Sequence, residues 1–254
     1  MTTMLPRTTS EITAEWMTEA LRGSGTIGPD TSVASVVIDP AAAGVGFMGE
    51  VGKVGVVYDG APTDAPTSMI AKFPTASPEV AAMMHPTRIY EREHRFYAEL
   101  APKSSLRTPA IYHVTCDTAD VPEDERYMLL MEDLSSLTLG DQLAGLSPEQ
   151  AEHALVALAA HHATFWGGAG LEEADFVPII NGPLNQAGAS IYDASLPGFM
   201  EAFGHVIRPE LEAYVAGYAS VRGQTVSYTH LRAHETTSLI SYAVFCLKRG
   251  GGGG

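Results

Sequence analysis

The chain has 254 residues, a length that suits one large domain or two small ones. Acidic residues outnumber basic ones by 30 to 15, and the net charge of −15 argues against general binding to nucleic acid or to an anionic membrane surface. No apolar run approaches the roughly twenty residues of a membrane span, and the first residues lack the layout of a signal peptide. With two cysteines there is no disulfide framework. We therefore expect a cytoplasmic protein.

The first third of the chain predicts a helix followed by short strands. Thr8 and Glu11 have the spacing of a capping box, and the apolar positions after them predict a helix that ends near Gly23. Alternating or β-branched patterns then predict strands over Val33–Asp39, Glu50–Tyr58 and Ser68–Phe73.

The rest of the chain predicts mostly helices around two more strands. A charged amphipathic helix is expected over Arg88–Leu100, and a second capping box at Ser147 to Gln150 opens a helix that runs through Ala151–Phe165. The segment Glu172–Ser195 is expected to be irregular, and Leu196–Ser220 to be helical. The two strands are predicted over Ile111–Cys116 and Arg126–Met131. This order of elements predicts an α+β fold with an antiparallel sheet.

The segment Thr225–Gly254 differs from everything before it. Two of its blocks, T-V-S-Y-T-H-L-R-A-H-E-T and I-S-Y-A-V-F-C-L, resemble in-frame translations of the two ends of a sequencing adapter, in the right order, and the segment ends in five glycines. We interpret residues 225–254 as adapter-derived and non-native, and expect no packed structure there. His230 and His234 could pass for a zinc pair, but Leu231 stands where a metalloprotease helix needs glutamate.

A glycine motif precedes the second predicted strand. Gly44, Gly46 and Gly49 form G-x-G-x-x-G, with Phe47 and Met48 between the last two. In a dinucleotide-binding fold this motif opens a helix, whereas here it runs into an alternating strand, as in the glycine-rich hairpin that closes over ATP phosphates. A plain hairpin turn remains an alternative, and so does an NAD site if the motif is taken alone.

A lysine and a glutamate follow at the spacing that such a nucleotide site requires. Lys72, in I-A-K on the next predicted strand, has the V-A-I-K character in which the lysine reaches the α- and β-phosphates. Glu93 on the charged helix is placed to pair with Lys72, and Glu91 is the rival partner. Each of these residues taken singly is more often an ordinary surface charge.

An apolar strand then enters a connector at Glu132, Asp133 and Leu134. In kinases this connector is the hinge whose backbone groups bind adenine, while the simpler alternative is the end of a buried strand. Because the glycine motif, Lys72, Glu93 and the connector occur in the expected order and setting, together they favour nucleotide binding more than any one does.

These stretches resemble the aminoglycoside-phosphotransferase and choline-kinase-like superfamily, most closely its ecdysteroid-kinase-like branch. The resemblance covers about Glu11 to Gln224 and rests on G-V-G-F-M-G-E-V, I-A-K-F-P, Y-E-R-E-H-R-F-Y-A-E-L, L-L-M-E-D-L and L-A-A-H-H-A-T-F-W. It implies a protein-kinase-like fold, with an N-terminal lobe at residues 1–134 and the first helices of a C-terminal lobe at 135–224. It also implies ATP and Mg2+ as cofactors and a small-molecule hydroxyl as phosphate acceptor. The nucleotide-binding residues it implies are Gly44, Gly46, Phe47, Met48, Gly49, Lys72, Glu93, Glu132, Asp133 and Leu134.

The sequence departs from this family at the catalytic loop. Such kinases carry H-G-D-x-x-x-x-N, whose aspartate accepts the substrate proton and whose asparagine holds magnesium, and the 254 residues contain no H-G-D. We therefore predict no catalytic residue and no metal ligand, and we interpret the chain as a truncated, inactive kinase that ends near Gln224. The alternatives are a non-catalytic, pseudokinase-like nucleotide-binding module and, less favoured, an NAD-dependent oxidoreductase.

Overall fold

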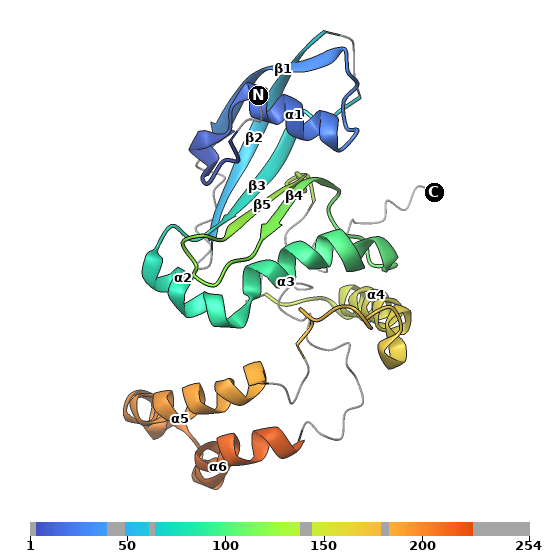
Figure 1. Cartoon of the computed structure of the whole chain (residues 1–254). Helices are drawn as coiled ribbons and strands as arrows, with labels where there is room; N and C mark the ends of the chain where they lie inside the picture. The colour runs from blue at the N-terminus through green and yellow to red at the C-terminus, as the bar shows by residue number, and fades with distance from the viewer. Residues whose placement is uncertain (1–3, 40–48, 61–63, 138–143, 179–182, 226–254) are drawn as a thin grey trace. The chain divides into compact units, whose positions relative to one another are not determined.

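The computed structural model describes residues 4–39, 49–60, 64–137, 144–178 and 183–225 (Figure 1). The chain divides into two compact units, and the boundary between them falls at His161 and His162. The first unit is α+β and the second contributes helices. The domain bounds drawn from the sequence, at residues 134 and 224, stay predictions.

Five antiparallel strands form the sheet of the first unit (Figure 1). Their order across the sheet is β1-β2-β3-β5-β4, and every neighbouring pair is antiparallel. All the strands predicted from the sequence are present, and the predicted α+β class is confirmed. The strands are β1 (Thr31–Asp39), β2 (Gly49–Gly60), β3 (Ser68–Pro74), β4 (Ile111–Asp117) and β5 (Arg126–Glu132).

Helix α1 (Ala14–Gly23) packs on one face of this sheet. Its cap is Thr13, whose Oγ1 accepts a hydrogen bond from the Trp16 N–H at 3.2 Å. The capping box predicted at Thr8 and Glu11 is wrong: Thr8 makes no side-chain cap bond, and Glu11 lies in a separate 3-10 turn before the helix. The main core lies between α1 and alternate residues of the strands, and includes Trp16, Met17, Leu21, Val54, Val56, Met69, Ala71, Phe73, Met128 and Leu130.

Helix α3 (Ile89–Arg95) and the π-helical turn η4 (Phe96–Leu100) pack on the other face, next to β4 and β5. The charged helix predicted over this region is therefore present, with a change of winding at Phe96. Tyr127, Leu129 and Met131 alternate with the core residues of β5 and are also buried. Since β5 is covered on both faces, its sequence is a continuous apolar run.

A short helix, α2 (Pro78–Met84), follows β3 and was not predicted. Ser77 caps it by accepting a hydrogen bond from the Val80 N–H at 3.3 Å, and Pro78 occupies its first turn. Local sequence around Pro78 indicates only the end of a strand. A serine followed by proline also starts helices, because the first turn has no use for the missing N–H.

Helix α4 (Pro148–Thr164) begins at the predicted capping box. Ser147 Oγ accepts from the Gln150 N–H at 3.2 Å, and Gln150 Oε1 accepts in return from the Ser147 N–H at 2.9 Å. Near its other end, buried His161 contacts Ser104 Oγ through Nδ1 at 2.7 Å. The remaining short 3-10 turns are η1 (Thr9–Glu11), η3 (His85–Thr87), η5 (Ala101–Lys103), η6 (Trp166–Gly168) and η7 (Gly204–Val206).

Two helices of the second unit correct the sequence interpretation. Helix α5 (Pro183–Phe203) begins inside the stretch expected to be irregular, because its proline lies at the first turn, where it is tolerated. The helix expected over Leu196–Ser220 is interrupted after Phe203, and α6 (Pro209–Thr225) starts at a second proline. Among the described helices, none combines the length and apolar character needed to cross a membrane.

Candidate functional site

The register of β2 and β3 places the predicted ligand-binding lysine on the sheet face opposite the α1 core. Lys72 pairs with Val51 on β2 and with Leu129 on β5, and Ile70 pairs with Lys53. Paired residues share a face, and residues two apart along a strand share it too. These five residues therefore lie on one face.

Lys72 and Glu93 form the ion pair predicted from the sequence. Lys72 Nζ donates to Glu93 Oε1 at 2.6 Å and to Oε2 at 2.7 Å. The Lys72 side chain keeps 29% of its surface exposed and Glu93 keeps 13%. The ammonium is therefore held in place by a carboxylate while it remains accessible from solution. Such an oriented cation, beside partly buried apolar residues, is suited to bind an anionic group such as a phosphate.

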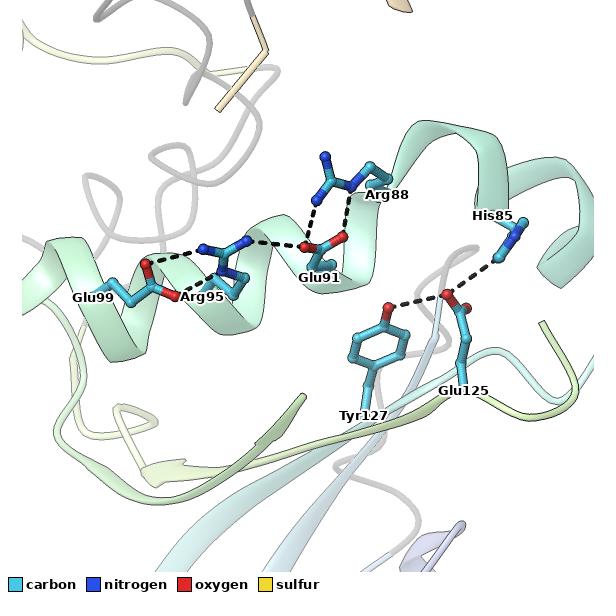
Figure 2. Close-up of polar contacts among 7 residues, drawn as sticks. All are labelled: His85, Arg88, Glu91, Arg95, Glu99, Glu125 and Tyr127. Carbon is cyan, nitrogen blue, oxygen red and sulfur yellow. Dashed lines mark hydrogen bonds and ion pairs between the residues drawn. The ribbon is translucent and has the colours of Figure 1, made fainter. Parts of the chain in front are cut away.

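Glu91, the rival partner, is bound instead by two arginines (Figure 2). Arg88 donates to both of its carboxylate oxygens at 2.6 Å, and Arg95 donates to Oε1 at 3.1 Å. Burial by itself would raise the pKa of Glu91, but the hydrogen bonds from Arg88 and Arg95 hold that pKa below its usual value. Glu91 therefore stays charged and is paired with Arg88 and Arg95 along the same helix segment. Glu93 is the partner of Lys72.

Further polar contacts fix the ends of this helix segment (Figure 2). Arg95 Nε donates to Glu99 Oε1 at 2.7 Å. Before the helix starts, His85 Nδ1 lies 3.1 Å from Glu125 Oε1, and the Tyr127 hydroxyl donates to the same oxygen at 3.1 Å. Burial raises the pKa of Tyr127, and the charge of Glu125 raises it further. The contact between His85 and Glu125 brings the turn before α3 close to the start of β5.

His94, next to Glu93, is a neutral residue of the core. Its Nδ1 lies 2.6 Å from the Tyr90 carbonyl, which can only accept, so Nδ1 carries the proton. Its Nε2 is buried and has no hydrogen-bond partner within the described part of the chain. Burial lowers the pKa of His94 to about 4. At neutral pH the ring therefore adds no positive charge beside Lys72.

The predicted connector begins where β5 ends. The Glu132 N–H donates to the Ala110 carbonyl at 2.8 Å, and the Glu132 carboxylate accepts from Arg107 Nη2 at 2.8 Å. The Leu134 carbonyl accepts from the Leu137 N–H at 2.8 Å, which closes a turn. The connector is therefore an ordered segment at the edge of the face that carries Lys72.

Asp133 joins the connector to the two strands β2 and β3. Its carboxylate accepts from Lys53 Nζ at 2.8 Å, from Ser68 Oγ at 2.5 Å and from the Ser135 N–H at 2.9 Å. Burial would raise the pKa of Asp133, but hydrogen bonds from Lys53, Ser68 and Ser135 hold it well below its usual range. Lys53 was not among the residues predicted for the site; the register of β2 against β3 puts it on the same face as Lys72.

Only the end of the glycine motif is open to description, since Gly44, Gly46, Phe47 and Met48 lie outside the described residues. Gly49 begins β2 and pairs with Pro74. A Cβ on Gly49 would lie 2.5 Å from the Phe73 carbonyl oxygen, so the close approach of the two strands requires glycine there. The motif runs into a strand, as predicted, and the helix that a dinucleotide-binding fold needs at this point is not there.

Other reactive groups of the described residues do not form a second centre. No group of three or more histidine, cysteine, aspartate or glutamate side chains among them could hold a metal ion. Cys116 is partly buried, and burial together with the nearby charge of Glu91 raises its pKa to about 11. The thiol therefore stays protonated at neutral pH, in a state that is a poor nucleophile.

A family model described as ecdysteroid kinase-like matches residues 43–238. The match includes the glycine motif, Lys72, Glu93 and the connector, and it runs past Gln224 into the segment for which we predict an adapter origin. That origin stays a prediction. No curated protein and no solved structure matches the chain.

Proposed function

Because the chain belongs to the ecdysteroid kinase-like family, we propose that it provides the ATP-binding part of a phosphotransferase that acts on a hydroxyl group of a small organic molecule. The observation that carries this proposal is Lys72, which is paired with Glu93 and partly exposed. It lies next to β2, the strand that begins at the last glycine of the motif. In this account the sheet and α3 belong to the N-terminal lobe of a protein-kinase-like fold.

The proposed roles are those that the family resemblance implies for these residues. Lys72, oriented by Glu93, binds the α- and β-phosphates, and the backbone of Gly44–Gly49 covers the phosphates. Backbone groups of Glu132–Leu134 bind the adenine. ATP supplies the phosphoryl group that is transferred, and Mg2+ neutralises its phosphate charge. No group of described side chains fits Mg2+, so we assign the ion no protein ligand.

We further propose that this chain does not transfer phosphate by itself. Phosphoryl transfer depends on a positioned base and on charge neutralisation, and no H-G-D occurs in the 254 residues. A non-catalytic nucleotide-binding module is the second candidate, and it rests on the same observation. Sequencing the gene past the codon for Gln224 separates the two, since a downstream H-G-D loop supports a truncated kinase and a stop codon supports the module.

Equilibrium binding of ATP and Mg2+, with wild type, Lys72→Met and Lys103→Met compared, tests the proposal. Lys103 is an exposed lysine on η5 and serves as the matched control. We expect Lys72→Met to weaken ATP binding about tenfold or more, because a charge-assisted contact to phosphate is worth about 1.5–3 kcal/mol. Lys103→Met should bind like wild type. Absence of ATP binding by wild type, or equal binding by both variants, contradicts the proposed site.

A coupled assay of ADP release tests the proposed lack of turnover. With ATP, Mg2+ and a panel of small alcohols, we expect release at the background rate of a sample without protein. Turnover that disappears in Lys72→Met would show that the chain contains catalytic groups that we have not recognised.

A further inference from the structure

A buried carboxylate joins three segments at the edge of the candidate site. Asp133 keeps only 8% of its side chain exposed, and it accepts from Lys53 on β2, from Ser68 on β3 and from the backbone N–H of Ser135. Lys53 Nζ donates in addition to Ser135 Oγ at 3.1 Å. A carboxylate with so little of its surface exposed is stable when it is paired and hydrogen-bonded, and its partners here join the three segments at one point.

Lys53 differs from Lys72 in what its ammonium contacts. The two residues lie on the same face, and the partner of Lys53 on β3 is Ile70, two positions from Lys72, or about 7 Å along the strand. Asp133 neutralises Lys53 at 2.8 Å, and the side chain of Lys53 is directed into the contact with the connector. Lys53 therefore acts on the connector, to which its ammonium is bonded at two points.

We propose that Lys53 is a positioning residue that, through Asp133, fixes the connector Glu132–Leu134 against the sheet and so makes the site selective for the base of the nucleotide. This inference rests on the proposed function, because it takes the connector as the adenine-binding segment. The Asp133 carboxylate accepts from donors on both of its oxygens, and in this inference it acts by holding the backbone on either side of it.

The inference separates recognition of the base from recognition of the phosphates. Loss of the Lys53–Asp133 pair should loosen the connector and weaken binding of ATP, while the phosphates remain bound by Lys72. Loss of Lys72 should weaken all nucleoside triphosphates alike. A role for Lys53 as a direct phosphate ligand predicts the opposite pattern, in which ATP and CTP lose affinity equally.

Competitive displacement of a fluorescent ATP analogue by ATP and by CTP tests this. The variants are Lys53→Met, the double variant Lys53→Met/Asp133→Asn, and Lys72→Met as the reference for phosphate contacts. Lys53→Met leaves a buried carboxylate with fewer donors and can fail to fold. The double variant keeps the shape of both side chains without an unpaired charge, so the test stands on it, with thermal unfolding as the check of folding.

We expect wild type to prefer ATP to CTP, and the double variant to lose about tenfold in ATP affinity with CTP affinity changed by less than about twofold. A further variant, Lys53→Arg, preserves the charge and should retain most of the wild-type affinity for ATP. Equal losses for ATP and CTP, no loss for either, or no base preference in wild type would overturn the inference while Lys72-dependent binding still supports the proposed function. If wild type binds no ATP, the proposed function and the inference both fail.

Discussion

At the scale of single residues, His94 couples the stability of the helix that carries Glu93 to pH. Its pKa is lowered to about 4 by burial, whereas an unfolded chain has a histidine pKa of about 6.5. Between these values the unfolded state binds a proton that the folded state does not, so the free energy of unfolding falls as the pH drops through this window. The loss from this residue is about 3 kcal/mol, at roughly 1.4 kcal/mol per pH unit.

Urea unfolding of wild type, His94→Gln and His205→Gln between about pH 7 and pH 4 measures this effect. His94→Gln is expected to be less stable at neutral pH but to show a shallower decline on acidification than wild type. His205 is exposed, and its replacement serves as the matched control. Parallel curves for His94→Gln and wild type would mean that His94 is not the buried neutral group described above.

The residues of the candidate site differ in how far sequence could predict them. Lys72 and Glu93 were predictable because a strand lysine followed by a helix glutamate at this spacing has one familiar structural use. The Lys53–Asp133 pair was not, since it depends on the register of β2 against β3 and on the path of the chain after β5. Local periodicity determines neither the register between two strands nor the path of the chain after a strand.

At the scale of elements, strand β2 and the N-terminal segment before α1 meet at a position that has no room for a side chain. The Thr9 N–H donates to Glu50 Oε1 at 2.8 Å, and Thr9 Oγ1 bonds to the same oxygen. A Cβ on Gly52 would lie 2.5 Å from Thr9 Cγ2, whereas a Cβ on Gly55 would meet nothing closer than 3.6 Å. Gly52 therefore sets how closely the segment can approach the sheet.

We expect Gly52→Ala to lower the free energy of unfolding by about 1–3 kcal/mol, the usual range for overpacking, and Gly55→Ala to change it little. Thr9→Ser removes the clashing methyl group but preserves the hydroxyl bond to Glu50, so the double variant Gly52→Ala/Thr9→Ser should recover much of the loss. Chemical denaturation of wild type and these three variants checks this. Equal stability of Gly52→Ala and Gly55→Ala, or no recovery in the double variant, would rule out the steric explanation.

The strands could be predicted from sequence more completely than the helices. β2 and β3 alternate between more and less buried residues, because their two faces are covered unequally. This alternation can be recognised in the sequence without knowing which strands lie beside them. The whole of α2 was missed because Pro78 was taken as the end of a strand, and the start of α5 was missed because Glu172–Ser195 was expected to be irregular. The capping box was assigned to Thr8 although Thr13 caps α1, since α1 has tryptophan at the position where a box needs an acidic residue.

At the scale of the whole molecule, the segment 225–254 is proposed to be foreign to the protein. If it derives from an adapter, a chain that ends at Gln224 should bind ATP with the affinity of the full chain, within about twofold. Binding measurements on the two chains in parallel test this. A large loss of ATP affinity on removal of the segment would contradict an adapter origin, because an adapter-derived segment has not been selected to support ATP binding.

The central claim is that this chain binds ATP on the sheet face that carries Lys72. Hydrogen exchange of the backbone with and without ATP and Mg2+ tests it most directly, because it reports where the nucleotide acts. We predict slower exchange on addition of ATP in β2 near Gly49, in β3 near Lys72 and in Glu132–Leu134, and a smaller change in Lys72→Met at the same ATP concentration. Exchange that ATP leaves unaltered in these segments, or slows only in helices of the second unit, would contradict the account.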